Sequence, residues 1–389
     1  MNILIISSQY PPINKANLYT ENMSLHYTAR QWAKMGHNVI AFPLFLQSES
    51  FLSDPRNNYS KKIFDTVADN VSLYIKDLKL NSSKGVKKSA LKSAAKQYRK
   101  ILKTLPEIDL LVVHEPTSTY DLTDYLRIPC HKVAVFTTKD ARTLTTPKFA
   151  RYSKIYDAFG FTLDSVRRRI DKIIKTDKPC VVTCSETPNF VMPATIDKVW
   201  DNDKLRLLFI GELTPFKNLD IIINAIAKTR NKDKMHLDII GTGSMEPALH
   251  RLIANLDLAN TVTLRGATSK VEAFKIMRES DVFVMANCHV TFGLAYLEAM
   301  SQGCIPICVE DDRIDGIVQD GLNGYILKEK DTEALTNRLD QIAEMSRTEL
   351  AKISKSTIET VSELTEEKIA ARYLDVVLST VETKKQKKK

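Results

Sequence analysis

The sequence predicts an α/β protein of two domains, each with a parallel β-sheet covered by helices. At 389 residues the chain exceeds the usual size of one domain. Short apolar runs rich in β-branched residues alternate with longer amphipathic segments, which is the pattern of repeated strand–helix–strand units. A polar, proline-containing stretch at 188–203 separates two such series and is expected to be a linker.

The first series starts at the first residues of the chain. Asn2 to Ser7 is expected to be a strand, and Leu18 to Met35 a helix that ends at Gly36. The polar segment 46–70 is expected to be an irregular surface excursion, and 87–105 a basic helix. Further buried strands are expected at 38–45, 71–76, 110–114, 133–138, 159–163 and 180–184.

The second series repeats this pattern after the linker. Strands are expected at 205–211, 235–241, 261–266, 281–286, 305–309 and 325–327. Asn218 is expected to cap one helix and Asp331 another. We therefore expect an N-terminal domain over 1–195, a C-terminal domain over 196–362, a helix over 363–383 that packs back on the N-terminal domain, and a basic disordered tail at 384–389.

The composition is that of a soluble globular protein, with 43% hydrophobic and 26% charged residues. No apolar run reaches the roughly 18 residues of a transmembrane helix, and the N-terminus lacks the features of a signal peptide. The six cysteines do not form a disulfide framework. Buried reduced thiols are expected, with a redox or metal role as the alternative. These features favour a cytoplasmic protein.

The net charge of +9 is concentrated in a few segments, above all between Lys84 and Lys103. One interpretation is a solvated helix face. Another is peripheral contact with the anionic inner face of a membrane. Aromatic residues are not interleaved as in a nucleic-acid platform, so no nucleic-acid partner is expected.

The stretch from Asn287 to Gly303 has the strongest chemical signal. It follows an apolar run, turns at Gly293 and enters a helix that carries a carboxylate, Glu298. The N–H groups of a helix start favour phosphate, and a carboxylate accepts hydrogen bonds from hydroxyls. Ligands of open α/β sheets bind beyond the carboxyl ends of the strands. One wall of the cleft expected between the domains would therefore hold Lys217, the turn Gly241 to Ser244, Thr291 to Gly293, and Glu298. For the turn at 241–244, a plain turn is the alternative.

The same rule nominates polar residues at strand ends in the first domain. They are Ser8 to Pro12, with Tyr10 among them, His114-Glu115 and Lys139-Asp140. We expect His114 and Glu115 to contact an acceptor, or else to be a polar strand end that caps a helix or faces water. Lys139 and Asp140 are equally expected to form a local ion pair.

Several short motifs occur in a fixed order along the chain. They are Gly36-His37-Asn-Val39, Gly211-Glu-Leu-Thr-Pro-Phe-Lys217-Asn218, Gly241-Thr-Gly243-Ser-Met-Glu246, Ser280-Asp281-Val-Phe-Val, Thr291-Phe-Gly-Leu-Ala-Tyr-Leu-Glu298 and Gly321-Leu-Asn-Gly324. These motifs resemble those of retaining GT-B glycosyltransferases of family 4. The resemblance covers nearly the whole chain and is strongest over 205–335.

The resemblance implies two Rossmann-like α/β/α domains that face each other across a cleft. It implies a UDP- or GDP-sugar donor in the C-terminal domain, a glycan or lipid-linked acceptor on the N-terminal domain, and neither a cofactor nor a metal. Lys217 would bind the donor diphosphate, and Glu298 the ribose hydroxyls. The backbone of Phe292, Gly293 and Leu294 would face the sugar and phosphates. Further donor-binding residues would be Gly211, Gly241, Gly243 and Thr291.

Three positions depart from the family pattern. Val290 and Glu212 stand where the family places a glutamate and an arginine, and Lys139 where it places a histidine. The leading hypothesis is a retaining glycosyltransferase of bacterial surface polysaccharide biosynthesis, with Lys217, Glu298 and Lys139 as catalytic residues. The departures motivate an alternative, a non-catalytic GT-B subunit that binds a glycan, a protein or a partner glycosyltransferase. A nucleotide-sugar epimerase is a third interpretation.

Overall fold

The computed structural model of the chain describes residues 1–8, 10, 24–47, 63–81, 85–183, 198, 200, 204–286, 294–310, 316–327 and 331–386. The chain divides into two compact units. The first unit comprises Met1–Thr187 and Glu366–Lys389, and the second comprises Pro188–Thr365. The division follows Thr187, where the sequence analysis expected it after residue 195.

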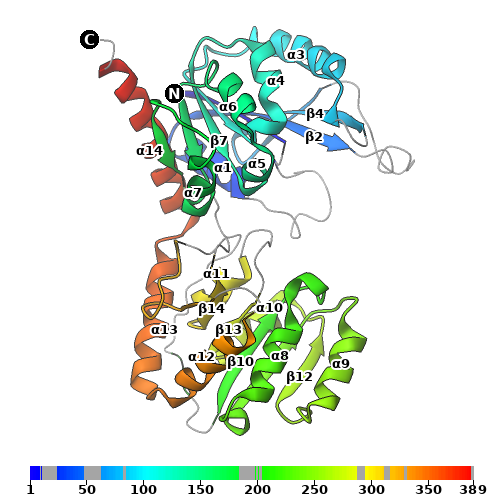
Figure 1. The fold of residues 1–389 in the computed structure, drawn as a ribbon. Helices are drawn as coiled ribbons and strands as arrows, with labels where there is room; N and C mark the ends of the chain where they lie inside the picture. Colours follow the sequence, from blue (N-terminus) through cyan, green and yellow to red (C-terminus); the bar gives the residue numbers. More distant parts are fainter. Residues whose placement is uncertain are drawn as a thin grey trace. The chain divides into compact units, whose positions relative to one another are not determined.

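The first unit is built on one mainly parallel sheet (Figure 1). Across the described ranges this sheet has nine strands in the order β3-β4-β2-β1-β6-β7-β8-β9, with β5 paired to β4. β3 and β5 run antiparallel to β4. The strands are β1 Asn2–Ser7, β2 Asn38–Gln47, β3 Phe64–Ala68, β4 Val71–Asn81, β5 Gly85–Val86, β6 Leu110–His114, β7 His131–Phe136, β8 Ala158–Phe161 and β9 Cys180–Val182.

β3 lies in the segment that the sequence analysis treated as irregular, which corrects that prediction. The strand is short and contains a charged residue, Asp65, so its sequence gives little signal of its own. Its register with β4, from Phe64 opposite Ile75 to Ala68 opposite Val71, is set by pairing within the sheet.

Helices cover both faces of this sheet because its central strands alternate their side chains between two cores. Leu4 and Ile6 of β1 face one core, and Ile3 and Ile5 face the other. The first core includes side chains of α3 and α4, and the second includes side chains of α1 and α14. The helices are α1 Ser24–Lys34, α3 Lys88–Leu102, α4 Pro116–Leu126, α5 Thr138–Thr143, α6 Thr146–Tyr152, α7 Asp164–Asp171 and α14 Glu366–Gln386.

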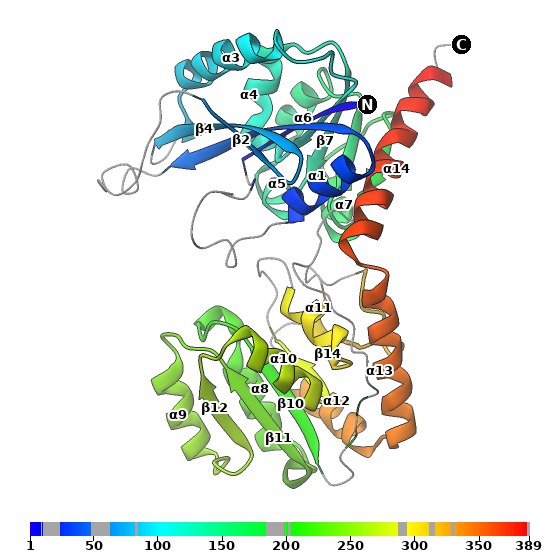
Figure 2. The same ribbon diagram turned by 180° about the vertical axis from the view of Figure 1, so that it is seen from behind.

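The C-terminal helix α14 is attached to the first unit along its length, beside α1 (Figures 1 and 2). Arg30 pairs with Glu366 at 2.5 Å, and the indole of Trp32 donates to the carbonyl of Ala370 at 2.8 Å. The helix continues to Gln386, so part of the tail expected to be disordered from residue 384 is helical. Lysine and glutamine are good helix formers, and no glycine or proline stops the helix earlier.

The second unit has a parallel sheet in the order β12-β11-β10-β13-β14-β15. The order reverses between β10 and β13, which makes the carboxyl ends of these two strands a topological switch point. The strands are β10 Leu205–Ile210, β11 Met235–Ile240, β12 Val262–Gly266, β13 Val282–Val284, β14 Ile305–Val309 and β15 Tyr325–Leu327.

Helices also cover both faces of the second sheet (Figures 1 and 2). α8 packs against α9 and α12, and α11 packs against α10 and α13. The helices are α8 Leu219–Lys228, α9 Glu246–Asn255, α10 Lys270–Glu279, α11 Leu294–Ser301, α12 Thr332–Glu344 and α13 Arg347–Ser362, with short 3-10 turns at η1 Pro215–Lys217 and η2 Lys232–Lys234.

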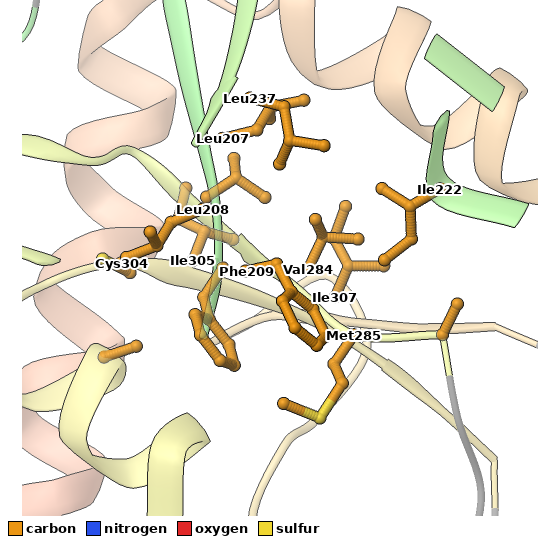
Figure 3. Close-up of a cluster of buried hydrophobic side chains, with 14 of the residues drawn as sticks. Leu207, Leu208, Phe209, Ile222, Leu237, Val284, Met285, Cys304, Ile305 and Ile307 are labelled. Atoms are coloured by element: carbon orange, nitrogen blue, oxygen red, sulfur yellow. The ribbon is translucent and has the colours of Figure 1, made fainter. Parts of the chain in front are cut away.

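Apolar strand residues fill the core of this unit (Figure 3). Leu207, Phe209 and Val284 lie among them. Cys304 and Cys308 are buried, as the apolar runs around them predicted, and their thiols donate to the carbonyls of Met277 and Tyr325. Among the residues that the structure describes, no helix is both long and apolar enough to cross a bilayer.

Candidate functional site

The loops that follow β10 and β11 are packed against each other through their backbones. The N–H of Gly211 donates to the carbonyl of Ile240, and the N–H of Leu213 to that of Thr242, each at 3.0 Å. Gly241 has a φ of +140°, and a Cβ there would lie 1.9 Å from the carbonyl oxygen of Gly211. Only glycine fits this close approach.

Gly243 is required by the same contact. A Cβ at this residue would lie 2.4 Å from the carbonyl oxygen of Leu213. The two glycines of the predicted nucleotide turn therefore hold the β11 loop against the β10 loop. They fix the position of the backbone at the carboxyl edge of both strands.

Lys217 is placed at the switch point by the short 3-10 turn η1. A Cβ on Gly211 would lie 3.8 Å from Cε of Lys217, so the lysine stem runs beside this glycine. Asn218 adopts the left-handed conformation at φ 49° and makes no side-chain cap bond to α8, although it occupies the N-cap position predicted for it. Its amide instead donates to the carbonyl of Ala286 at 2.8 Å, which ties η1 to the end of β13.

Glu298 lies on α11, and its side chain is largely buried. Its Oε1 is 3.1 Å from Nζ of Lys270, the first residue of α10. Burial raises the pKa of Glu298, and the neighbouring Lys270 ammonium partly opposes this effect. Sequence reasoning missed Lys270. Ser269 with Glu272 is a visible N-cap signature, but the contact between α10 and α11 depends on the tertiary fold.

Four predicted positions, Val290, Thr291, Phe292 and Gly293, lie outside the described residues. Leu294 is the first residue of α11. Glu212 is exposed in the β10 loop.

In the first unit, three polar side chains meet at the ends of adjacent strands. Ser8 follows β1, Glu115 follows β6, and Lys139 lies in the first turn of α5, which follows β7. The hydroxyl of Ser8 donates to Oε2 of Glu115, and Nζ of Lys139 is 3.6 Å from Oε1 of the same carboxylate. We call these three residues the Glu115 cluster.

The structure pairs Lys139 with Glu115 and not with Asp140, which corrects the predicted local ion pair. Asp140 is fully buried and forms a capping box with Thr137 at the start of α5. It also accepts hydrogen bonds from Thr117 of α4. Because these contacts occupy both of its oxygens, Asp140 does not face an acceptor.

Two further residues predicted on the acceptor side are buried. His114 is hydrogen-bonded through Nε2 to the hydroxyl of Tyr373 at 2.6 Å, and burial lowers the pKa of His114 to about 3. The hydroxyl of Tyr10 is 3.0 Å from Nδ1 of His26. Burial raises the pKa of Tyr10 well above its ordinary value. These contacts lie inside the first unit, which corrects the prediction that the two side chains face an acceptor.

Metal-ligating side chains do not gather in the described part of the chain. Within it, no group of three or more His, Cys, Asp or Glu residues is placed to hold a metal ion.

Comparison with known proteins relates the region that holds Lys217, Lys270 and Glu298 to a protein family. Residues 195–359 match the model of the family described as Glycosyl transferases group 1. This stretch is a glycosyl transferases group 1 domain. It comprises most of the second unit, including its switch point.

Curated relatives match the chain over part of their length. The putative colanic acid biosynthesis glycosyltransferase WcaL of Salmonella typhimurium is 27% identical over 176 residues, which are 43% of this chain and 41% of that protein. The poly(glycerol-phosphate) alpha-glucosyltransferase of Bacillus subtilis is 25% identical over 194 residues, 48% of this chain and 28% of that protein. The D-inositol 3-phosphate glycosyltransferase of Stackebrandtia nassauensis is 28% identical over 151 residues, 36% of this chain and 34% of that protein. The matches thus span less than half of each relative.

Solved structures match nearly the whole chain. Anabaena HepE in complex with UDP and glucose has a TM-score of 0.63 and 14% identity, and the match covers 97% of this chain and 100% of that one. The apo form of the lipopolysaccharide outer core galactosyltransferase WaaB has a TM-score of 0.70 and 12% identity, with 97% and 99% covered. At such identities the likeness concerns the fold. The chain has the GT-B fold of two Rossmann-like α/β domains, as its sequence predicted.

Proposed function

We propose that the protein is a retaining glycosyltransferase that moves a sugar from a nucleotide-sugar donor to a glycan or lipid-linked acceptor. The observation that supports this most is the arrangement of the group 1 domain. Lys217 lies at the switch point of its sheet, where ligands of such sheets bind, and the helix with Glu298 leads away from β13 at the same switch point.

In this proposal the second unit binds the donor. The ammonium of Lys217 neutralises charge that develops on the departing diphosphate. Glu298 accepts hydrogen bonds from the ribose hydroxyls; burial raises the pKa of this carboxyl, and Lys270 at 3.1 Å partly opposes that effect. The β10 and β11 loops keep the backbone that would face the phosphates in one position. No metal and no cofactor take part in the proposed reaction.

The comparisons suggest UDP as the first nucleotide to test. Anabaena HepE was solved with UDP, with UDP and glucose, and with UDP-glucose. The pneumococcal O-GlcNAc transferase GtfA was solved with UDP and GlcNAc. We therefore propose a UDP-sugar as donor, with a GDP-sugar as the second choice.

For the acceptor, we propose a surface polysaccharide or its lipid-linked precursor, made at the cytoplasmic side of a bacterial membrane. The names of WcaL and of the poly(glycerol-phosphate) alpha-glucosyltransferase support this class. Helix α3 supports peripheral contact with an anionic membrane, because it contains no acidic residue and exposes Lys88, Lys92, Lys96 and Lys100.

The second candidate function is a non-catalytic subunit with the same fold. Two departures from the family pattern favour this second function. Val290 stands in place of a carboxylate, and Glu212 stands in place of a cation. Release of free nucleotide from a panel of UDP- and GDP-sugars, with and without lipid-linked acceptors, separates the two functions. The enzyme releases nucleotide in an acceptor-dependent way, and Glu298→Gln abolishes most of this release. A subunit releases none, although it binds its partner.

A further inference from the structure

The carboxylate of Glu115 is held in a way that the fold itself does not require. It is fully buried, and its Oε2 accepts a hydrogen bond from Ser8. Among the described residues its Oε1 has no hydrogen-bond partner, since the ammonium of Lys139 at 3.6 Å is within ion-pair distance but beyond hydrogen-bond distance. Burying a carboxylate with an unsatisfied oxygen is costly, and such groups call for an explanation.

The backbone at Glu115 adds a second cost. This residue adopts the left-handed conformation with φ 53° and ψ 61°, which is uncommon for a residue with a long side chain. It occupies the N-cap position of α4, but its side chain makes no cap bond. The neighbouring carboxylate of Asp140 already joins the starts of α4 and α5. Local helix capping therefore does not explain Glu115.

The contacts of Glu115 indicate that its carboxylate interacts with Lys139. Burial raises the pKa of Glu115, and the hydrogen bond from Ser8 and the charge of Lys139 favour the ionised form. Ser8, Glu115 and Lys139 come from three neighbouring strand ends, β1, β6 and β7. Lys139 is the exposed member, with half of its side chain accessible. The cluster thus presents one ammonium group at the carboxyl edge of the sheet, backed by a buried anion.

We propose that Glu115, oriented by Ser8, is a positioning residue that holds the ammonium of Lys139 at the carboxyl edge of the first unit. There Lys139 donates hydrogen bonds to an oxygen of the acceptor. Glu115 itself does not touch substrate, because its carboxylate is buried beneath Lys139. This inference rests on the proposed function for the identity of the substrate, but not for the pairing within the cluster.

Glu115→Gln removes the charge and keeps the size and the hydrogen bond from Ser8. We expect this variant to lower kcat about tenfold or more, with little change in the KM for the donor, because a misplaced group loses transition-state contacts. In a Lys139→Met background the same change should have less than about a twofold effect, since the group that Glu115 positions is then absent. Glu115→Asp, which keeps the charge, should recover part of the activity.

A second readout does not require turnover. An ammonium in contact with a carboxylate must leave that contact before its nitrogen reacts with an acylating reagent, so Glu115→Gln should raise the acylation rate of Lys139, as followed by peptide mass spectrometry. Exposed Lys154 in the same protein is the internal reference, and its rate should not change. Ser8→Ala should act in the same direction as Glu115→Gln and serves as the second variant if Glu115→Gln fails to fold.

The proposal is overturned if Lys139 in the Glu115→Gln or Ser8→Ala variant is acylated at the wild-type rate. It is also overturned if Glu115→Gln lowers kcat in the Lys139→Met background by the same factor as in the wild-type protein. If wild-type protein releases no nucleotide from any donor, the proposed function fails. The acylation rates then still decide whether Glu115 positions Lys139.

Discussion

The close approach of the β10 and β11 loops makes a quantitative prediction for Gly241→Ala. The new Cβ would lie 1.9 Å from the backbone oxygen of Gly211, where no flexible side chain is able to move away. The φ of +140° adds about 1–3 kcal/mol of backbone strain for alanine. Separating the loops would lose the hydrogen bonds from Gly211 to Ile240 and from Leu213 to Thr242, each worth about 1 kcal/mol. We expect a total loss of about 3–5 kcal/mol.

Equilibrium urea unfolding measures this loss, with Gly266→Ala as the matched control. Gly266 also has a positive φ, +70°, but a Cβ there would meet nothing within 4 Å. Its substitution should cost about 1–2 kcal/mol. Equal losses for the two variants, within about 0.5 kcal/mol, would refute the claim that the loops require glycine for contact. Folded Gly241→Ala protein should also bind UDP more weakly than Gly266→Ala protein.

Three further predictions concern pH, stability and membranes. Because burial raises the pKa of Glu298, the carboxylate is lost as pH falls through that raised value. UDP affinity should therefore decrease on acidification in wild-type protein, beginning at a higher pH than an ordinary glutamate would give, and stay low and nearly constant in Glu298→Gln. Asp140→Ala should cost about 2–4 kcal/mol in urea unfolding, because it leaves the donors of Thr117 and Thr137 unpaired. Replacing Lys92, Lys96 and Lys100 by glutamine should weaken sedimentation with anionic vesicles by about 1 kcal/mol per lysine, and leave neutral vesicles unaffected.

Much of the fold was predictable because its strands are short apolar runs with clear ends. The bounds expected for β14 and β15 coincide with those of the structure. The end of α14 and the strand β3 were not predicted. The sequence of β3 has little signal of its own, and no stop signal marks where α14 ends.

The candidate site was predictable only where a local motif carries it. Gly241 and Lys217 follow strand ends, a feature that can be read along the chain. The pairs Lys270–Glu298 and Lys139–Glu115 join elements distant in sequence, so they depend on strand order and helix packing. The prediction for Asp140 was wrong. Thr137, three residues earlier, indicates a capping box with Asp140, but Lys139 beside it equally suggested a local ion pair.

The central claim is that the second unit binds a nucleotide-sugar through Lys217 and Glu298. Calorimetric titration of wild-type protein, Lys217→Met and Glu298→Gln with UDP and GDP tests it directly. We predict binding of one nucleotide with a Kd on the order of micromolar, weakened about tenfold or more by each substitution. The control Gly321→Ala, in an open turn before β15, should bind as wild type does. No detectable binding of either nucleotide to wild-type protein, or unchanged affinity in both variants, would contradict the account.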